Sequence, residues 1–265
     1  TFYYTLINGT TRGIINWKKN STSITAFHTP FEGEGGYEGD NISDYSGYGH
    51  NSTPNGATWN ETGGYDGGGA YHFDGNDFIE TGTSFEGMTQ NFSIVFWVKP
   101  GSTQENYADI FGNHGNNQKG IVMQQNNANL NEYSWGGGYD TGWWTGSGNV
   151  QLVTNLWQHI AAVHNGTHCI FYVNGTQQSF GDCSQTMVPN DAYTFKFGRG
   201  FQEGNRFFNG VIDEFVIYNH SLSAEQVLAL SNNDSDVMVG NETDVNNVWQ
   251  ACITPNDGHE DGSEI

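Results

Sequence analysis

The chain has 265 residues, with 8 Lys or Arg against 29 Asp or Glu, so its formal net charge at pH 7 is −21. Such an acidic surface disfavours nucleic acid and anionic membranes as partners, because both carry negative charge. No stretch reaches the roughly 20 apolar residues needed to cross a bilayer. The acids are spread along the chain, so the charge alone locates no site, and it is also consistent with simple solubility or adaptation to salt.

The strand signals are strong and the helix signals are weak. Residues 92–98 are apolar at alternate positions on both faces, which predicts a strand buried on both sides in a two-sheet sandwich. Residues 168–173 repeat this pattern and end at Asn174-Gly175, a pair that favours a type I′ hairpin turn. Residues 215–218 predict another strand. A short helix through Leu230 is expected next, capped by Ser221 or Ser223.

Several motifs occur in a fixed order and together resemble a laminin-G-like, concanavalin A-type jelly roll over about residues 27–232. They lie at residues 44–49, 56–59, 71–75, 92–100, 157–160, 169–176, 197–198 and 208–225. The resemblance implies an all-β sandwich of two antiparallel sheets. It also implies an extracellular binding role more often than catalysis.

The two ends of the chain lie outside this jelly roll. Residues 14–19 resemble the central Trp strand of an immunoglobulin-like domain, and residues 244–258 resemble its late Cys-bearing strand. The sequence therefore predicts a small discontinuous Ig-like β domain from residues 1–26 and 233–265. Its core would contain Trp17 and Cys252, on strands facing each other across two sheets.

This arrangement is similar to repeat units of large archaeal and bacterial surface proteins, in which a jelly roll is inserted into an Ig-like domain. The two segments are at least one strand short of a seven-stranded sandwich. Either they merely decorate the jelly roll, or the missing strand comes from another chain. In the second case, strand exchange or tandem repetition would link copies end to end.

The family resemblance also implies a calcium ion, the one cofactor expected here. It would join the early loop at Asp44, with carbonyls around Gly47 and Gly49, to Asp213 near the final strand. Calcium takes six to eight oxygen ligands, many of them from backbone, so a glycine-rich loop suits it. The alternative is that Asp44 closes an Asx-turn and Asp213 caps a strand end.

The chain has three cysteines. Cys169 lies on a predicted strand and Cys183 follows the returning strand, so the two can face each other as a disulfide. Two buried free thiols are the alternative. Cys252 is left over and is expected to pack as a small hydrophobic residue.

Eleven Asn-X-Ser/Thr sequons suggest a glycosylated surface protein. Nine are expected in accessible loops, whereas those at Asn91 and Asn174 lie in or beside strands and are expected to be protected. The nine are at Asn8, Asn20, Asn41, Asn51, Asn60, Asn165, Asn219, Asn233 and Asn241.

An aromatic, glycine-rich segment at residues 135–144 is the predicted ligand surface, through Trp135, Tyr139, Trp143 and Trp144. Aromatic rings on such a backbone stack on sugars or fill a protein interface. Packing of these rings over the edge of the sandwich is the alternative.

Catalytic patterns are missing from the sequence. Glycoside hydrolysis needs two carboxylates flanking the scissile bond, and no strand carries the Glu-X-Asp-X-X-Glu pattern of the related glucanases. Asp213 and Glu214 are adjacent, so a regular strand would point them to opposite faces. Neither a His-Glu-X-X-His motif nor a Gly-X-Ser-X-Gly elbow occurs.

We therefore expect a non-catalytic, extracellular, glycosylated surface protein that acts in adhesion or builds an extracellular filament. Its partners would be copies of itself or surface glycans and proteins. A carbohydrate-binding lectin module is the alternative function, and a glycoside hydrolase-like enzyme comes third.

Overall fold

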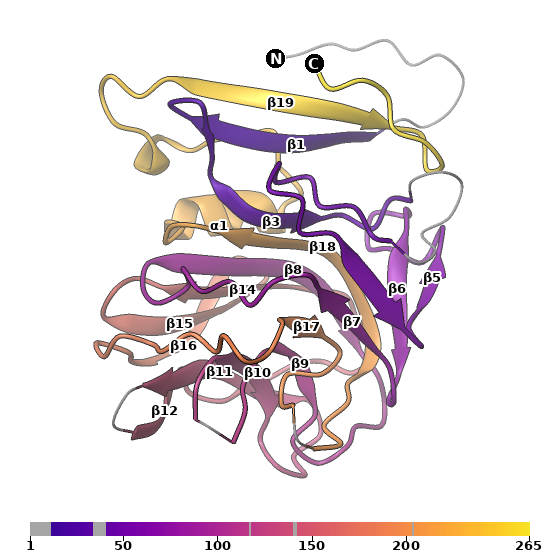
Figure 1. The fold of residues 1–265 in the computed structure, drawn as a ribbon, viewed down its shortest axis with the longest axis vertical. Helices are drawn as coiled ribbons and strands as arrows, with labels where there is room; N and C mark the ends of the chain where they lie inside the picture. Colours follow the sequence, from indigo (N-terminus) through magenta and orange to yellow (C-terminus); the bar gives the residue numbers. More distant parts are fainter. Residues whose placement is uncertain (1–11, 34–40, 117, 140–141, 203) are drawn as a thin grey trace.

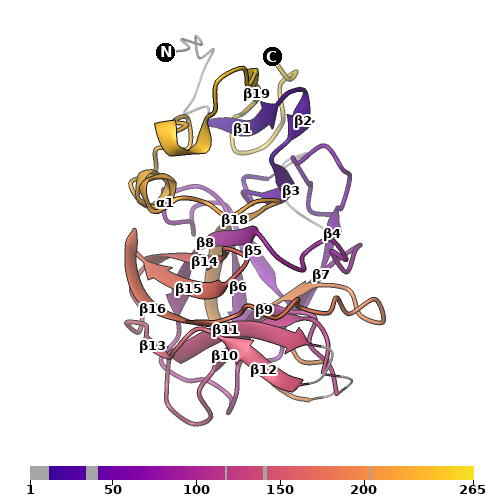
Figure 2. The ribbon, with the colours of Figure 1, turned by 90° about the vertical axis from the view of Figure 1, so that its left-hand side faces the viewer.

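The computed structural model describes residues 12–33, 41–116, 118–139, 142–202 and 204–265, and it describes residues 142–145 by their backbone only. Two antiparallel sheets face each other, and a third, small sheet covers the outer side of one of them (Figures 1 and 2). We call these the back, front and terminal sheets. In the described residues no helix is long and apolar enough to span a membrane.

The back sheet is built around two long central strands, and β3 pairs with one of them, β18. Its strands in spatial order are β16 (Thr176–Asp182), β15 (His168–Val173), β14 (Gln158–His164), β8 (Phe92–Pro100), β18 (Asn209–Tyr218), β6 (Ala70–Asp74) and β5 (Thr58–Asn60), with β3 (Thr25–Thr29) beside β18.

The front sheet runs in the order β12 (Gly142–Gly146), β11 (Glu132–Tyr139), β10 (Ile121–Gln125), β9 (Asp109–Gly112), β17 (Lys196–Phe197), β7 (Phe78–Thr81) and β4 (Ser52–Asn55), and β13 (Val150–Gln151) pairs with β11. The terminal sheet contains β19 (Trp249–Asn256), β1 (Arg12–Lys19) and β2 (Thr22–Ser23). The helical segments are α1 (Ala224–Ser231) and the short 3-10 turn η1 (Gly240–Glu242).

Aromatic side chains fill the space between the back and front sheets. The ring centroids of Phe215 and Phe197 are 4.3 Å apart, and those of Phe96 and Phe111 are 5.8 Å apart. Strand β8 is buried on both faces, as its double apolar pattern predicts. Its outer face packs in a second cluster that includes Leu222, two residues before α1, and Val227, within α1. The predicted two-sheet jelly roll is confirmed.

Two local predictions are also confirmed. Asn174 and Gly175 both have positive φ, 48° and 74°, and they turn β15 into β16 as a type I′ pair requires. The helix α1 begins directly after Ser223, whose hydroxyl accepts a hydrogen bond from the Gln226 backbone N–H.

Strand β18 is interrupted by a β-bulge. Asp213 pairs with Trp97 and Val216 pairs with Val95, so β18 contains one residue more than β8 over the same stretch. Glu214 is the extra residue and has φ 50°. The expectation that Asp213 and Glu214 point to opposite faces is therefore wrong, because the bulge resets the alternation. Asp213 and Glu214 stand together before Phe215, which is the next residue of β18 whose side chain points into the core.

The two ends of the chain meet, but not as two facing sheets. β1 and β19 are direct antiparallel neighbours over eight residue pairs, from Arg12↔Asn256 to Lys19↔Trp249. Trp17 pairs with Ala251 beside Cys252 and remains partly exposed, whereas Cys252 is buried. The expected pair of strands facing each other across a sandwich is thus replaced by one three-stranded sheet in the described residues. The expected jelly-roll limits, 27 and 232, fall within β3 and directly after α1.

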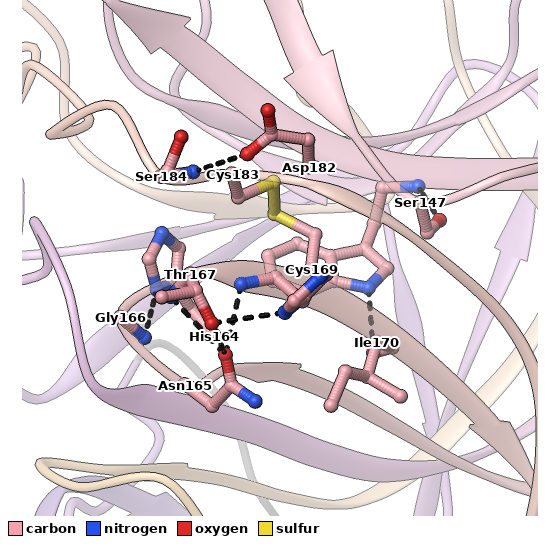
Figure 3. Close-up of a disulfide and its surroundings, with 12 residues drawn as sticks. Ser147, His164, Asn165, Gly166, Thr167, Cys169, Ile170, Asp182, Cys183 and Ser184 are labelled. Atoms are coloured by element: carbon pink, nitrogen blue, oxygen red, sulfur yellow. Dashed lines mark hydrogen bonds between the residues drawn. A yellow bond between two sulfur atoms is a disulfide. The ribbon is translucent and has the colours of Figure 1, made fainter.

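Cys169 and Cys183 form a disulfide across the β15–β16 hairpin, and their Cα atoms are 5.5 Å apart (Figure 3). The Cys183 N–H also donates to the Thr167 carbonyl. His164 lies beside the bond in Figure 3, and its Nδ1 accepts from the Gly166 N–H. The disulfide uses both thiols, so this His-Cys-Cys group offers no metal site. Cys252 is a buried free cysteine.

Candidate functional site

A groove of about 860 Å³ runs over the outer face of the back sheet. Its floor is one row of cross-strand partners: Thr58 on β5 pairs with His72, His72 with Val211, and Val211 with Lys99. Trp157 directly precedes β14, whose Gln158 pairs with Val98, so Trp157 continues the row beyond Lys99. Five strands at about 4.8 Å spacing give a row of about 19 Å.

The groove combines one aromatic face with several polar groups. Trp157 is partly exposed, and Thr58 and His72 are exposed. The Lys99 ammonium and the backbone of the loop at residues 61–64 also line the groove. An aromatic ring next to hydroxyl, imidazole and ammonium groups matches a polyhydroxylated ligand, which presents both C–H faces and hydrogen-bonding edges.

The loop that forms one wall of the groove is anchored to the bulge in β18. The Tyr65 N–H donates to Asp213 Oδ2 at 2.8 Å. A Cβ added at Gly64 would lie 2.7 Å from the same oxygen, so only glycine allows this approach. The ring of Tyr65 stacks on Trp97 and meets Trp157 edge-on at a centroid distance of 6.4 Å. The bulge therefore positions one wall of the groove.

Carboxylates gather on the other side of this loop. Oxygens of Glu32, Asp66 and Glu214 lie within 4.8 Å of one another, and we call these three residues and the adjacent Asp213 the acidic cluster. The Arg12 guanidinium forms ion pairs with Glu32 and Asp66. Four carboxylates thus face one cation that holds β1 of the terminal sheet against the jelly roll.

Burial makes three of these acids, Glu32, Asp213 and Glu214, hold protons more tightly than usual. It raises the pKa of the Asp213 carboxyl to about 8, although the Tyr65 N–H bonds to the charged form. Burial, and then the charge of Asp213, raises the pKa of Glu214 well above its ordinary value. Burial also raises the pKa of Glu32, and Arg12 partly offsets this. Burial therefore favours the protonated forms of these three carboxyls near neutral pH.

The acidic cluster opens onto a cleft of about 330 Å³ between the terminal sheet and the back sheet. Two buried histidines also line it, His28 and His159. Burial lowers the pKa of His28 to about 4 and that of His159 to about 3, so both are neutral at pH 7. They add no positive charge beside the acids.

Asp44 lies in a different environment from Asp213. Its Oδ1 accepts from the N–H groups of His28 and Ser46, and its Oδ2 accepts from the Ser46 hydroxyl and the His50 N–H. The bond from the Ser46 N–H closes the Asx-turn that was the alternative to a metal role, and the other three hold the loop around it. Gly47 and Gly49 follow with positive φ, as this tight loop requires. The structure does not bring Asp44 into the acidic cluster.

The predicted aromatic surface is only partly described. Trp135 belongs to the core: it is fully buried, and its indole N–H donates to the Ile170 carbonyl at 2.9 Å. Its assignment as a ligand-binding residue is wrong, because β11 turns this side chain between the sheets. Tyr139 is partly exposed. The side chains of Trp143 and Trp144 lie outside the described residues.

Every sequon asparagine in the described residues is exposed, including Asn91 and Asn174. These last two have positive φ and lie on turns, so the expectation that strands protect them is wrong. Asn219 is also exposed, and its side-chain amide donates a hydrogen bond to the Ser23 carbonyl. Asn8 lies outside the described residues. The other exposed sequon asparagines are Asn20, Asn41, Asn51, Asn60, Asn165, Asn233 and Asn241.

A family model described as the concanavalin A-like lectin/glucanases superfamily, laminin-G type, matches residues 73–228, more than half of the chain. The chain belongs to this superfamily. No curated protein sequence matches it.

Solved structures of this concanavalin A-like fold are similar at low sequence identity. Domain 4 of AbnA, an extracellular GH43 arabinanase from Geobacillus stearothermophilus solved with arabinotriose, has a TM-score of 0.61 at 20% identity, over 78% of this chain and 98% of that domain.

The binding domain of Paraclostridial Mosquitocidal Protein 1 has a TM-score of 0.59 at 20% identity, over 79% of this chain and 52% of that one. The botulinum neurotoxin serotype G binding domain has a TM-score of 0.56 at 18% identity, over 80% of this chain and 51% of that one. The present chain therefore spans about half of each toxin domain. At these identities the likeness establishes the fold alone.

The sequence did not identify Glu32, Asp66, His72 or Trp157 as site residues. The alternation of side chains along a strand marks Thr58, Asn60 and His72 as outward-facing, so this part of the groove could have been predicted from the sequence. The meeting of Glu32, Asp66 and Glu214 depends on the bulge and on loop packing, for which the sequence has no local signal.

Proposed function

We propose that this chain is a non-catalytic, glycan-binding module of an extracellular surface protein, and that its groove at Thr58, His72, Val211, Lys99 and Trp157 holds the ligand. The observation that supports this is the cross-strand row about 19 Å long, in which Thr58, His72 and Lys99 are polar, Val211 is apolar and Trp157 stands at one end. The arabinotriose bound to domain 4 of the arabinanase supports a saccharide as the ligand class.

Loss of binding in groove variants tests this proposal. Trp157→Ala and His72→Ala should each weaken binding on a glycan array at least about tenfold, equivalent to about 1.4 kcal/mol. Phe180→Ala is the matched control, because Phe180 is an exposed aromatic on β16 outside the groove. A wild type that binds no glycan, or binding lost only in a Trp143→Ala/Trp144→Ala double variant, would contradict it.

We further propose that the acidic cluster binds calcium, in place of the site expected at Asp44, Gly47, Gly49 and Asp213. Carboxylate oxygens are the ligands that calcium prefers, and Glu32, Asp66 and Glu214 offer three within 4.8 Å beside Asp213. The Arg12 guanidinium supplies only one positive charge there. A cation in the cluster would also hold the loop at Tyr65 that forms the groove wall.

Adhesion through self-assembly is a second candidate role, which one edge of the terminal sheet favours. On the side of β19 away from β1, Ile253 exchanges two backbone hydrogen bonds with Ile265. The backbone N–H and carbonyl of Ala251 point to the same side of β19 as those of Ile253, and they have no hydrogen-bond partner among the described residues. An open edge recruits strands from other chains, so copies could join there.

A proline at this position tests the assembly role. Ala251→Pro removes the outward N–H and keeps the ladder to β1, which uses the alternate residues. If copies join at this edge, the wild type should show oligomers in sedimentation that the variant lacks. A monomeric wild type, or oligomers unchanged in the variant, would rule the edge out.

A further inference from the structure

The sequon Asn60-Glu61-Thr62 lies inside the groove. Asn60 ends β5, and its Oδ1 accepts from the Thr62 N–H at 3.1 Å and from the Thr62 hydroxyl at 3.4 Å. The amide nitrogen Nδ2, to which an N-glycan would be joined, has no hydrogen-bond partner among the described residues. Asn60 is exposed, so this nitrogen is accessible for modification.

The register directs Asn60 toward the groove. Two residues after Thr58 on the same strand, it shares the outward face of the back sheet and pairs with Ala70. Gly63 packs closely against it: a Cβ on Gly63 would lie 2.9 Å from the Asn60 Cβ, so only glycine fits there. Asn60 lines the groove together with Gly63, Gly64 and Ala70, so a sugar on its Nδ2 would begin inside the groove, at the end of the row opposite Trp157.

From this arrangement we infer that an N-linked glycan on Asn60 lies along the groove of its own chain and blocks the groove to external glycans. The inference rests on the proposed function of the groove and describes its regulation. The same groups that suit a free saccharide, the polar groups of the floor and the face of Trp157, suit a saccharide already attached at Asn60. Attachment gives the tethered glycan a high effective concentration, so it outcompetes a free ligand of similar affinity.

The sequon at Asn165 provides a matched control. Asn165 Oδ1 accepts from the Thr167 N–H at 3.2 Å and from the Thr167 hydroxyl at 3.0 Å, as Asn60 Oδ1 does from Thr62, and it also accepts from the His168 N–H at 2.8 Å. It is also exposed, but it lies in the β14–β15 loop near the disulfide, outside the groove (Figure 3). The two sites therefore differ in their surroundings and share the two hydrogen bonds within the sequon.

The first experiment needs no external ligand. The chain is produced in a eukaryotic secretory host, and an amidase that removes N-glycans is applied to the native protein while glycopeptides are followed by mass spectrometry. Release from Asn60 should be at least about tenfold slower than from Asn165, because the groove protects the linkage. Trp157→Ala should remove most of this difference. Equal rates in the wild type, or an unmodified Asn60 beside a modified Asn165, would overturn the inference.

The second experiment compares glycan-array binding of protein with and without glycans. Protein from a host that adds no N-glycans should bind, the glycosylated wild type should bind at least about tenfold more weakly, and Asn60→Gln from the eukaryotic host should bind like the unmodified protein. Asn165→Gln should leave the block in place. Unmodified protein that binds no glycan would defeat the proposed function, whereas equal binding by the glycosylated wild type and Asn60→Gln would defeat the block.

Discussion

Tyr65 and Asp213, which are 148 residues apart, are joined by a 2.8 Å hydrogen bond from the Tyr65 N–H to Asp213 Oδ2. This bond connects the wall of the groove to the acidic cluster, because the Tyr65 ring also meets Trp157, and Asp213 lies on β18 two residues after Val211 in the groove floor. Changes in the charge of the cluster should therefore affect both the stability of the fold and the shape of the groove.

Stability should fall as the pH rises from 7 to 8.5 in the presence of a chelator. The Asp213 pKa is about 8 in the folded chain and about 3.9 in an unfolded one. Its contribution is therefore full below pH 4 and is lost as the pH rises through 8. His28 and His159 act in the opposite direction below about pH 6.5, and Asp109, whose pKa is raised to about 7 by burial, adds to the fall in the lower part of this range. Melting temperatures across the range check this, and Asp213→Asn should make the slope smaller, with Asp109 and Glu214 keeping part of it. A wild type with the same slope as Asp213→Asn would contradict the assignment.

Calcium should stabilise the chain more at pH 8 than at pH 5, since the ion competes with protons for the same carboxylates. Differential scanning calorimetry with calcium or with chelator measures the effect. Chelation should lower the melting temperature of the wild type and barely change that of Asp213→Ala. An equal response in both proteins would show that calcium does not bind at the acidic cluster. No response in either protein would show that the chain does not bind calcium.

Replacing both Cys169 and Cys183 with Ser should lower the free energy of unfolding by roughly 3 kcal/mol, the value for a closed loop of about 15 residues. The bond closes a segment with a sequence separation of 14. Urea denaturation measures the loss. Reductant should destabilise the wild type by a similar amount and leave the stability of the double variant unchanged. A reductant effect of equal size in both proteins would show that the effect does not come from this disulfide.

Trp17→Ala should loosen the terminal sheet before the jelly roll. The indole donates to the Ser235 carbonyl and lies edge-on to Trp249, but it is partly exposed. We therefore expect a loss near the lower end of the about 3–5 kcal/mol typical of a buried Trp, or below it. Hydrogen exchange should speed up in β1 and β19 and stay unchanged in β8 and β14. Uniform acceleration would show that the two parts unfold as one unit.

The sequence by itself determined the sandwich. Alternating apolar residues at 92–98 and 168–173 suit only strands buried between layers, and Asn174-Gly175 and Ser223 fix a turn and a helix start through local backbone chemistry. Such features depend on neighbours in the chain, so they can be read without knowledge of the fold.

Only the tertiary structure decided which residues meet at the sites. The extra residue at Glu214 brings adjacent acids to one side of β18, and the register of five strands aligns Thr58 with Trp157 across the back sheet. A shift of one residue in any of these pairings would point the side chains to the other face. Trp135 illustrates the same limit, because its aromatic, glycine-rich context did not reveal that β11 turns it into the core.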